Sequence, residues 1–596
     1  MIKFNQSDYH DHRGILIILI SYAFFYGSFF YYFPQEAITF AKTFLGDYEF
    51  NNSNTFYLNE ILKSPITLQI YFPYFLLKIG IDEEILNRIW SGLTSTISIL
   101  SFFYFSKIIT KSNLYSFFVV LLLLTHKFIN THFYSIHFPV SYFYFGQMGM
   151  YLCLLTISFM ILKKPNLLIF ILIINFFVHA AWGLFGLAFV AIYNFIKKNS
   201  LKITKINYFL LILLSVFTFL IHSDINKKKY YILYNNTVVD QLEKKPSYLE
   251  SHNPYFQFEK KTIFKDILNF IKFFFFEILI LLILFLRNKI KNKNLILFFK
   301  ILLFLSCLSL FIYFLTNHFK PLIFFLNYIN INILILIDRM NITRFMNLDN
   351  ISIILFTISY FFFLSKNLKL LFPKFFLTII LFLFSISILS NGYILSEHLP
   401  IIKIEKIIHN FIIYSFTGSL IFYLIFKNKI EEVLNNFRFV KIINNLYSFS
   451  LVSLFICSMI YLPIVKKIQF DSFYKPIEED FLKLDTSKEI IVGPSIHGYI
   501  DPMYLANAPI ILPIFFIYDD QDKLVDIYCN KEFEKTFDLS IEYFRYADKC
   551  LESRSFADWL DIKSRIGSKY VIVRNYVNLN LKLMAENNFL KVYVIN

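Results

Sequence analysis

The stretch KKPNLLIFILIINFFVHAAWGLFGLAFVAIYNFIKK, residues 163–198, decides how the rest of this chain is interpreted. It is apolar throughout, it is closed at each end by a lysine pair, and His179 lies near its middle. A bilayer core about 30 Å thick is crossed by ~20 helical residues, so the stretch is too long for one crossing. Two short helices that turn near His179 would place both lysine pairs on the cytoplasmic side, where Lys and Arg gather in membrane proteins.

The composition agrees with this interpretation. The chain is 57% hydrophobic and only 17% charged, whereas soluble domains carry about 25% charged residues. Its mean hydropathy is +0.56. Most of its surface must face lipid or other helices, which excludes a soluble enzyme for the bulk of the chain.

Other apolar runs reach or approach the length of a membrane span. The first follows Lys3 and Arg13, and no small-residue cleavage site comes after it, so we expect a retained signal anchor with a cytoplasmic N-terminus. Residues 321–337 are apolar too, but a crossing there would break the parity, and we interpret them as re-entrant or interfacial. The first run covers residues 14–33. The other predicted spans are residues 89–109, 114–133, 142–162, 208–221, 266–286, 295–316, 351–365, 371–389, 408–426 and 448–465.

We therefore predict a polytopic α-helical membrane protein with about 13 transmembrane helices. Residues 1–465 form the multi-span domain, with an outer loop at 34–88 and a second loop at 222–265. An odd number of crossings places residues 466–596 outside the cytoplasm. Apolar runs interleaved with polar residues in the outer loop suggest helices that lie in the interface.

The tail alternates strand and helix patterns, which is typical of a small soluble α/β domain. We expect strands at residues 489–492, 510–516, 570–573 and 590–595, and helices at 519–550, 556–566 and 579–587. Cys529 and Cys550 lie in this domain. Outside the cytoplasm they could form a disulfide, and buried free thiols are the alternative.

The whole chain has a net charge of +16, and residues 466–596 hold 17 Lys and Arg against 20 Asp and Glu, or −3, so the membrane domain carries +19. Cytoplasmic loops enriched in Lys and Arg explain this excess without nucleic acid as a partner. The sequence also contains no phosphate-binding glycine loop, no GxSxG and no HExxH motif.

The layout resembles that of the GT-C glycosyltransferases, membrane enzymes that use polyprenyl-phosphate sugars and include protein mannosyltransferases and aminoarabinose transferases. The segment YFPQEAITFAK, residues 32–42, is similar to the acidic motif and helix at the start of that family's first outer loop. The resemblance implies that Glu36 acts as general base on the acceptor or helps to hold a divalent metal. An interfacial carboxylate in the first turn of a helix is the alternative.

Two departures from the family pattern bear on these roles. The family has Asp with a neighbouring acid, whereas Gln35 precedes Glu36 here, so Asp47 is a second catalytic candidate. The stretch that matches the family's second acidic site, residues 134–141, offers His137 and no carboxylate. His137 becomes a substrate-binding candidate, and a divalent metal cofactor is left open.

A lipid-linked phosphate needs cations at the outer interface, and the arginine fork matches phosphate oxygens. Arg339 and Arg344 would lie outside on this topology, against the positive-inside trend; ordinary cytoplasmic anchors are the alternative. His179, with Trp182, would line an acceptor cavity or belong to the aromatic belt.

The expected function is transfer of a sugar from a polyprenyl-phosphate donor to an acceptor on the extracytoplasmic face of a bacterial inner membrane. A transporter or flippase of a lipid-linked saccharide and a non-catalytic membrane assembly protein are the alternatives. The expected partners are membrane lipid and the polyprenyl-phosphate sugar donor.

Overall fold

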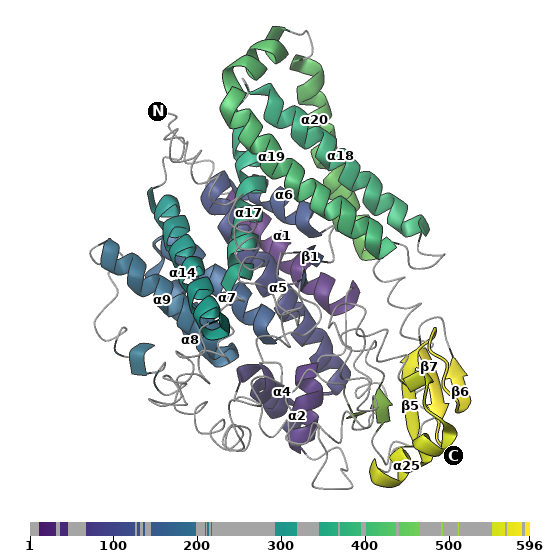
Figure 1. Cartoon of the computed structure of the whole chain (residues 1–596). Coiled ribbons are helices and arrows are strands. Elements are labelled where there is room, and N and C mark those ends of the chain that lie inside the picture. The colour runs from purple at the N-terminus through teal and green to yellow at the C-terminus, as the bar shows by residue number, and fades with distance from the viewer. Residues whose placement is uncertain are drawn as a thin grey trace.

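The computed structural model shows a bundle of helices and a C-terminal sheet (Figure 1). It describes residues 11–30, 36–45, 67–124, 128–130, 135–137, 145–197, 209, 211–213, 216, 293–318, 345–367, 370–394, 401–436, 440–464, 490–492, 510–511, 551–566, 569–586 and 590–596.

The helices of the bundle fall close to the predicted spans, and residues 163–198 do form two helices that turn at His179. They are α1 (Asp11–Phe25), continued by the π-helical turn η2 (Tyr26–Phe30), α2 (Glu36–Leu45), α4 (Leu68–Lys78), α5 (Glu83–Thr110), α6 (Asn113–Leu124), α7 (Phe145–Ile161), α8 (Pro165–Val178), α9 (Ala180–Ile196), α14 (Lys293–His318), α17 (Phe345–Ser365), α18 (Leu371–Ile394), α19 (Ile401–Asn436) and α20 (Val440–Ile456), continued by η4 (Cys457–Tyr461). Predicted spans 208–221 and 266–286 and the segment 321–337 lie largely or wholly outside the described residues.

One predicted span is too long. The run 114–133 was expected to be a single helix, but α6 ends at Leu124 and strand β1 (Phe128–Asn130) follows. β1 pairs antiparallel with β2 (Ser135–His137). The apolar residues after Leu124 thus belong partly to a strand, a distinction that hydrophobicity alone does not make for short runs.

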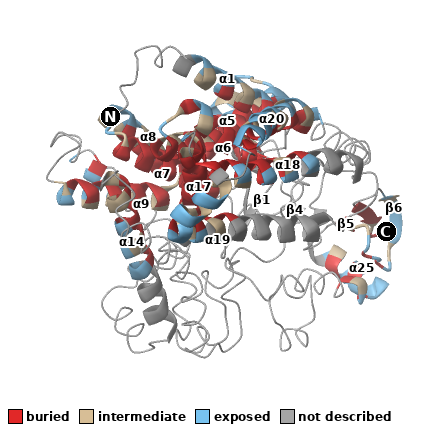
Figure 2. Ribbon diagram, turned by 90° about the horizontal axis from the view of Figure 1, so that it is seen from above, coloured by how far each residue is buried: buried red, intermediate tan, exposed pale blue. Residues whose placement is uncertain are grey.

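Several helices carry apolar side chains on the face turned away from the bundle. Among the described residues, the helical regions Glu83–Thr110 and Val440–Ile464 are long and apolar enough to cross a membrane, and the other apolar helices are shorter. On α20 and its continuation η4 a stripe of large apolar side chains with helical spacing is exposed, namely Ile442, Leu446, Phe449, Val452, Ile456 and Ile460. An exposed apolar stripe along a helix that is buried on its other face is what lipid contact requires. The bundle is therefore that of an α-helical membrane protein (Figure 2).

The directions of the first helices follow from their contacts. Gly27, in the turn η2 that continues α1, lies against Ser91 near the start of α5, so α1 and α5 are antiparallel. At the other end of α5, Lys164 in the α7–α8 turn is a charged neighbour of Lys107. We call this end the lysine end, and the opposite one, where α2 and α4 lie, the α2–α4 end.

The later helices continue this alternation. Phe298 near the start of α14 packs against Phe105 near the end of α5, with 5.7 Å between the centres of the two rings. Helix α14 therefore begins at the lysine end. Lys366, just after α17, donates a hydrogen bond to Thr110 O at the end of α5. The chain therefore leaves α14 and enters α17 at the same α2–α4 end.

The last helix of the bundle leads away from the lysine end. Tyr447 in α20 is hydrogen-bonded to Ser365 at the end of α17, whereas Ser458 O in η4 accepts from Tyr22 Oη of α1 at 2.7 Å. α1 thus starts at the lysine end and α20 leaves at the α2–α4 end. In Figure 1 the C-terminal sheet lies at the same end as α2 and α4.

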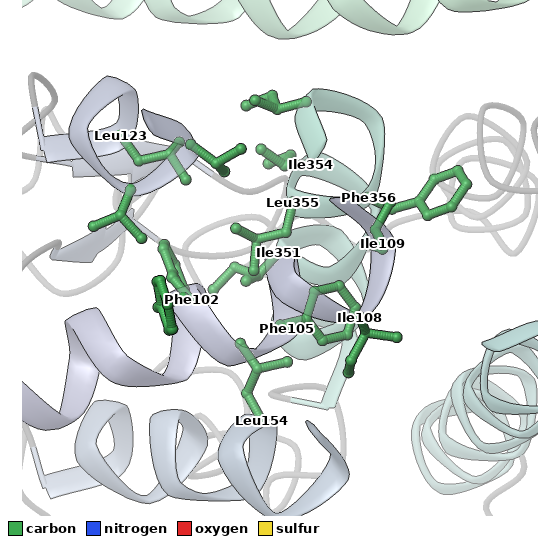
Figure 3. Close-up of a cluster of buried hydrophobic side chains, with 14 of the residues drawn as sticks. Phe102, Phe105, Ile108, Ile109, Leu123, Leu154, Ile351, Ile354, Leu355 and Phe356 are labelled. Carbon is green, nitrogen blue, oxygen red and sulfur yellow. The ribbon is translucent and has the colours of Figure 1, made fainter. Parts of the chain in front are cut away.

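The centre of the bundle is a single apolar core shared by α5, α6, α7 and α17 (Figure 3). Phe102 and Phe105 come from α5 and Leu123 from α6, and they meet Leu154 of α7 and Ile351 of α17. The helices α5, α6 and α7 follow one another in the sequence, and α17 joins them from much later in the chain, so this core fixes the helix order that positions both ends.

The C-terminal sheet has the order β4-β3-β5-β7-β6. β3 (Ile490–Val492) is parallel to β4 (Ile510–Ile511) and to β5 (Tyr570–Arg574), while β7 (Leu590–Val594) is antiparallel to β5 and to β6 (Lys582–Glu586). The predicted helix at 579–587 is wrong, because those residues supply the edge strand β6. The predicted helix at 519–550 lies outside the described residues.

Helix α25 (Phe556–Ile566) covers this sheet as predicted, with Trp559 fully buried in the domain's apolar core. The Ser555 N–H and hydroxyl each donate to Asp558 Oδ2 at 2.8 Å. These bonds cap the start of α25 and lower the pKa of Asp558, because they favour the ionised carboxylate.

Candidate active site

The candidate active site is the α2–α4 end of the bundle, where Glu36 is the first residue of α2. Helix α2 packs through Ile38 against Leu86 and Trp90 of α5 in a small apolar cluster. The N-terminus of a helix carries a partial positive charge that stabilises a nearby carboxylate. The sequence therefore places an acid at the start of a short helix beside the bundle's main helix.

An ion pair holds α2 in that position. Lys42 Nζ lies 2.7 Å from Glu83 Oε2, and the two side chains are 12% and 26% exposed. A partly buried pair is screened less by salt than a surface pair such as Arg88 with Glu84. Glu83 opens α5 behind the cap formed by Asp82, whose carboxylate accepts from the Glu84 and Ile85 N–H groups. The start of α5 thus fixes the register of α2.

The α8–α9 turn lies against the start of α4. Val178 O at the end of α8 accepts from Thr67 Oγ1 at 2.8 Å and from Gln69 Nε2 at 3.0 Å. Two donors on one buried carbonyl satisfy a helix C-terminus that has no partner of its own. The outer loop and the helix pair at residues 163–198 are therefore joined at this end.

His179 is the capping residue between α8 and α9. Its Nδ1 accepts from the Trp182 N–H at 3.5 Å, and its side chain is half-buried. A neutral imidazole that accepts at Nδ1 carries its proton on Nε2. Trp182 is only 2% exposed and packs on Phe185 and beside Gly149, a position that suits packing better than stacking on a sugar.

The structure places some of the other predicted residues and leaves the rest aside. His137 ends β2, in register with Phe128 of β1. Arg344 directly precedes Phe345, the first residue of α17, which starts at the α2–α4 end. Arg344 itself lies outside the described residues. So do four other predicted residues, namely Asp47, Arg339, Cys529 and Cys550. Cys153, Cys307 and Cys457 are free thiols.

One buried acid was missed by the sequence analysis. Asp349 of α17 is fully buried and accepts from Ser306 Oγ of α14 at 3.1 Å. An ionisable residue inside a membrane bundle is costly and marks a site of function or of specific pairing. The predicted span began at residue 351, which set Asp349 in a loop. Asp349 is the fifth residue of α17. The sequence would have shown it as an acid within the helix only if the start of α17 had been predicted correctly.

No metal site is assigned. Within the described ranges, no group of three or more His, Cys, Asp or Glu side chains gathers as a metal ion would require. The acids that the family resemblance offered for a metal are Glu36, of which the structure gives the backbone position, and Asp47.

No protein-family model and no curated protein matches this chain. Two solved structures match over 98% of this chain and 98% of their own: ArnT from Cupriavidus metallidurans in the apo state, with 9% identity and a TM-score of 0.39, and ArnT from Cupriavidus metallidurans bound to undecaprenyl phosphate, with 10% identity and a TM-score of 0.41.

Proposed function

We propose that this chain is an integral membrane glycosyltransferase of the GT-C type, which transfers a sugar from a polyprenyl-phosphate donor to an acceptor at the α2–α4 end. The observation that carries the proposal is the position of Glu36. It opens a short helix that directly follows the first membrane helix and is locked to the start of α5 by the Lys42–Glu83 pair.

The reaction is a single inverting displacement. The oxygen of the acceptor's hydroxyl group bonds to the anomeric carbon of the sugar, and Glu36 accepts the proton that this hydroxyl group loses. At the same time the bond between the anomeric carbon and the carrier's phosphate oxygen breaks. The polyprenyl phosphate leaves with the electron pair, and Arg339 and Arg344 stabilise its negative charge. The start of α17 at the α2–α4 end supports this role, because Arg344 is adjacent to it in sequence.

The topology supports an extracytoplasmic reaction. The lysine end carries the basic residues expected at the cytoplasmic face, which leaves the α2–α4 end and the domain at 466–596 outside. The N-terminus would then be cytoplasmic in a bacterial inner membrane. His179 and His137 belong to the outer face in this arrangement and are candidates for contact with substrate.

The test is donor consumption by membranes that contain the full-length chain. Polyprenyl-phosphate hexoses and pentoses are supplied, and release of polyprenyl phosphate is measured. Glu36→Gln should slow release by roughly 10²- to 10⁴-fold, the usual contribution of a general base. Glu84→Gln is the matched control, because Glu84 lies at the same end in an exposed pair with Arg88.

The outcomes separate the assignments. Full release by Glu36→Gln, with loss in Asp47→Asn, would move the base to Asp47. If wild-type membranes bind a polyprenyl-phosphate sugar without consuming it, a transporter of a lipid-linked saccharide takes the place of the glycosyltransferase. If they neither consume nor bind any such sugar, the glycosyltransferase proposal is wrong, and an assembly protein takes its place.

A further inference from the structure

The lysine end carries a group of cations that the proposed reaction does not use. We call Lys107, Lys111, Lys164 and Lys366 the lysine cluster. They come from the end of α5, the residue after it, the α7–α8 turn and the residue after α17. Helices that are distant in sequence thus bring four ammonium groups to one end of the bundle.

Like charges face each other inside this cluster. Lys164 is a charged neighbour of Lys107, and Lys111 is a charged neighbour of Lys366. Burial, followed by the charge of Lys111, lowers the pKa of Lys366 to about 8. Holding like charges together is unfavourable, and a bound anion would reverse that effect.

Aromatic rings fix three of these ammonium groups. Lys366 Nζ lies 5.4 Å from the centre of the Tyr115 ring. Lys111 Nζ lies 5.8 Å from Phe363, and Lys107 Nζ 5.9 Å from Tyr104. A lysine held over a ring has already lost part of its rotamer freedom, which reduces the entropic cost of binding an anion.

The protein itself does not neutralise the cluster within the described residues. No described carboxylate forms an ion pair with any of its four lysines, whereas Lys42 and Arg88 at the other end are paired with Glu83 and Glu84. The buried acid at the lysine end, Glu431, accepts instead from the start of α18 and from Tyr423.

Apolar side chains exposed beside the cluster indicate which anion it takes. Leu114 of α6 is 48% exposed near Lys111, and Leu167 and Phe170 of α8, 46% and 60% exposed, follow Lys164. A free phosphate ion would gain nothing from these residues, but acyl chains would cover them.

We propose that the lysine cluster binds the phosphate of an anionic phospholipid whose acyl chains lie along the outward faces of α6 and α8. Cationic residues at a helix end attract anionic lipid with about 1 kcal/mol for each lysine, or roughly fivefold in affinity. The proposal requires that the chain lies in a membrane, and it is independent of sugar transfer.

The experiment uses the full-length chain, stripped of lipid in a neutral detergent and titrated with phosphatidylglycerol. Native mass spectrometry measures bound lipid, and phosphatidylcholine is the neutral comparison. The wild type should retain phosphatidylglycerol selectively, and the double variant Lys111→Gln with Lys366→Gln should bind it roughly 25-fold more weakly. The control is Lys78→Gln at the α2–α4 end, where Lys78 Nζ also lies 5.9 Å from a ring, that of Tyr74. It should leave binding unchanged.

Two further arms decide the remaining cases. If the double variant fails to fold, Lys164→Gln replaces it; this lysine is exposed, and its loss should weaken binding about fivefold. Equal binding of phosphatidylglycerol by the wild type and these variants would overturn the proposal. It would also be overturned if inorganic phosphate displaced the lipid at similar concentration, because the site would then hold a free anion.

Discussion

At the scale of single residues, buried acids of the bundle accept hydrogen bonds from donors on neighbouring helices. Glu431 Oε2 accepts from the Leu371 N–H at 2.8 Å, and its Oε1 accepts from the Phe372 N–H at 3.4 Å and from Tyr423 Oη at 2.9 Å. The first N–H groups of a helix have no partner within the helix. Glu431 of α19 therefore caps α18 from a neighbouring helix and joins the two at the lysine end.

Replacing Glu431 by Ala should destabilise the protein by about 2 to 5 kcal/mol, because buried donors are left without an acceptor. Glu432 is the matched control, since the next side chain in the same helix is exposed. Glu432→Ala should change stability by less than about 0.5 kcal/mol. Unfolding in mixed micelles of SDS and a mild detergent measures both. Equal stability of the two variants would show that the cap contributes nothing.

Sequence reasoning reaches some residues of the site and not others. Glu36 was found because its position after the first span and its neighbours form a local pattern. Asp349 and Glu431 carry no such pattern, since their burial is created by α14 and α18, which pack on them from elsewhere in the chain. The capping role of His179 was likewise not predicted, although its place in the turn was.

At the scale of elements, hydrophobic length predicted the membrane helices well and the short elements poorly. Residues 579–587 contain Leu, Lys, Met, Ala and Glu, all good helix formers, which favoured a helix. They instead form β6, which pairs with β7 across a bulge between Leu583 and Ala585. An edge strand is stabilised by its neighbour more than by its own propensity, and that neighbour is invisible in the local sequence.

The contact between α1 and α5 depends on small residues. A Cβ atom added at Gly27 would lie 2.4 Å from Ser91 O and 2.7 Å from Ser95 Cβ. Small residues let membrane helices approach closely. Gly27 lies in η2, the turn that continues α1.

Gly27→Ala should lower stability by about 1 to 3 kcal/mol, because the new methyl group must push α1 away from α5. Gly14→Ala is the control in the same helix, since a Cβ at Gly14 would meet no atom within 4 Å. Unfolding of both variants in mixed micelles gives the comparison. If Gly27→Ala were as stable as Gly14→Ala, the close approach would not be needed for the fold.

At the scale of the whole molecule, the order of helix directions carries the functional argument. α9 ends at the lysine end and α14 begins there, so the stretch between them returns to the side from which it left. α14 ends and α17 begins at the α2–α4 end. The sequence predicted this alternation from its lysine pairs because charge asymmetry is a property of the whole chain. Which helices touch, as in the core of Figure 3, had no such signal.

Accessibility of single cysteines in intact cells tests this arrangement. In a chain whose five native cysteines are replaced, new cysteines at Lys78 and Ser564 should react with a membrane-impermeant reagent. A cysteine at Lys164 should react only after permeabilisation. All three side chains are exposed in the folded chain, so protection reports the side of the membrane and not burial.

Each result has a distinct meaning. Reaction at Lys78 and Ser564 alone places the site and the C-terminal domain outside together, where the proposed transfer requires them. Reaction at Lys164 alone would show that the orientation of the molecule in the membrane is inverted and that the lysine cluster faces the outer leaflet. An extracytoplasmic transfer at Glu36 would then be impossible. If Lys78 and Ser564 lay on opposite sides, the number of crossings between them would be odd. The helix contacts require an even number, because α4 lies at the end of the bundle from which α20 leaves.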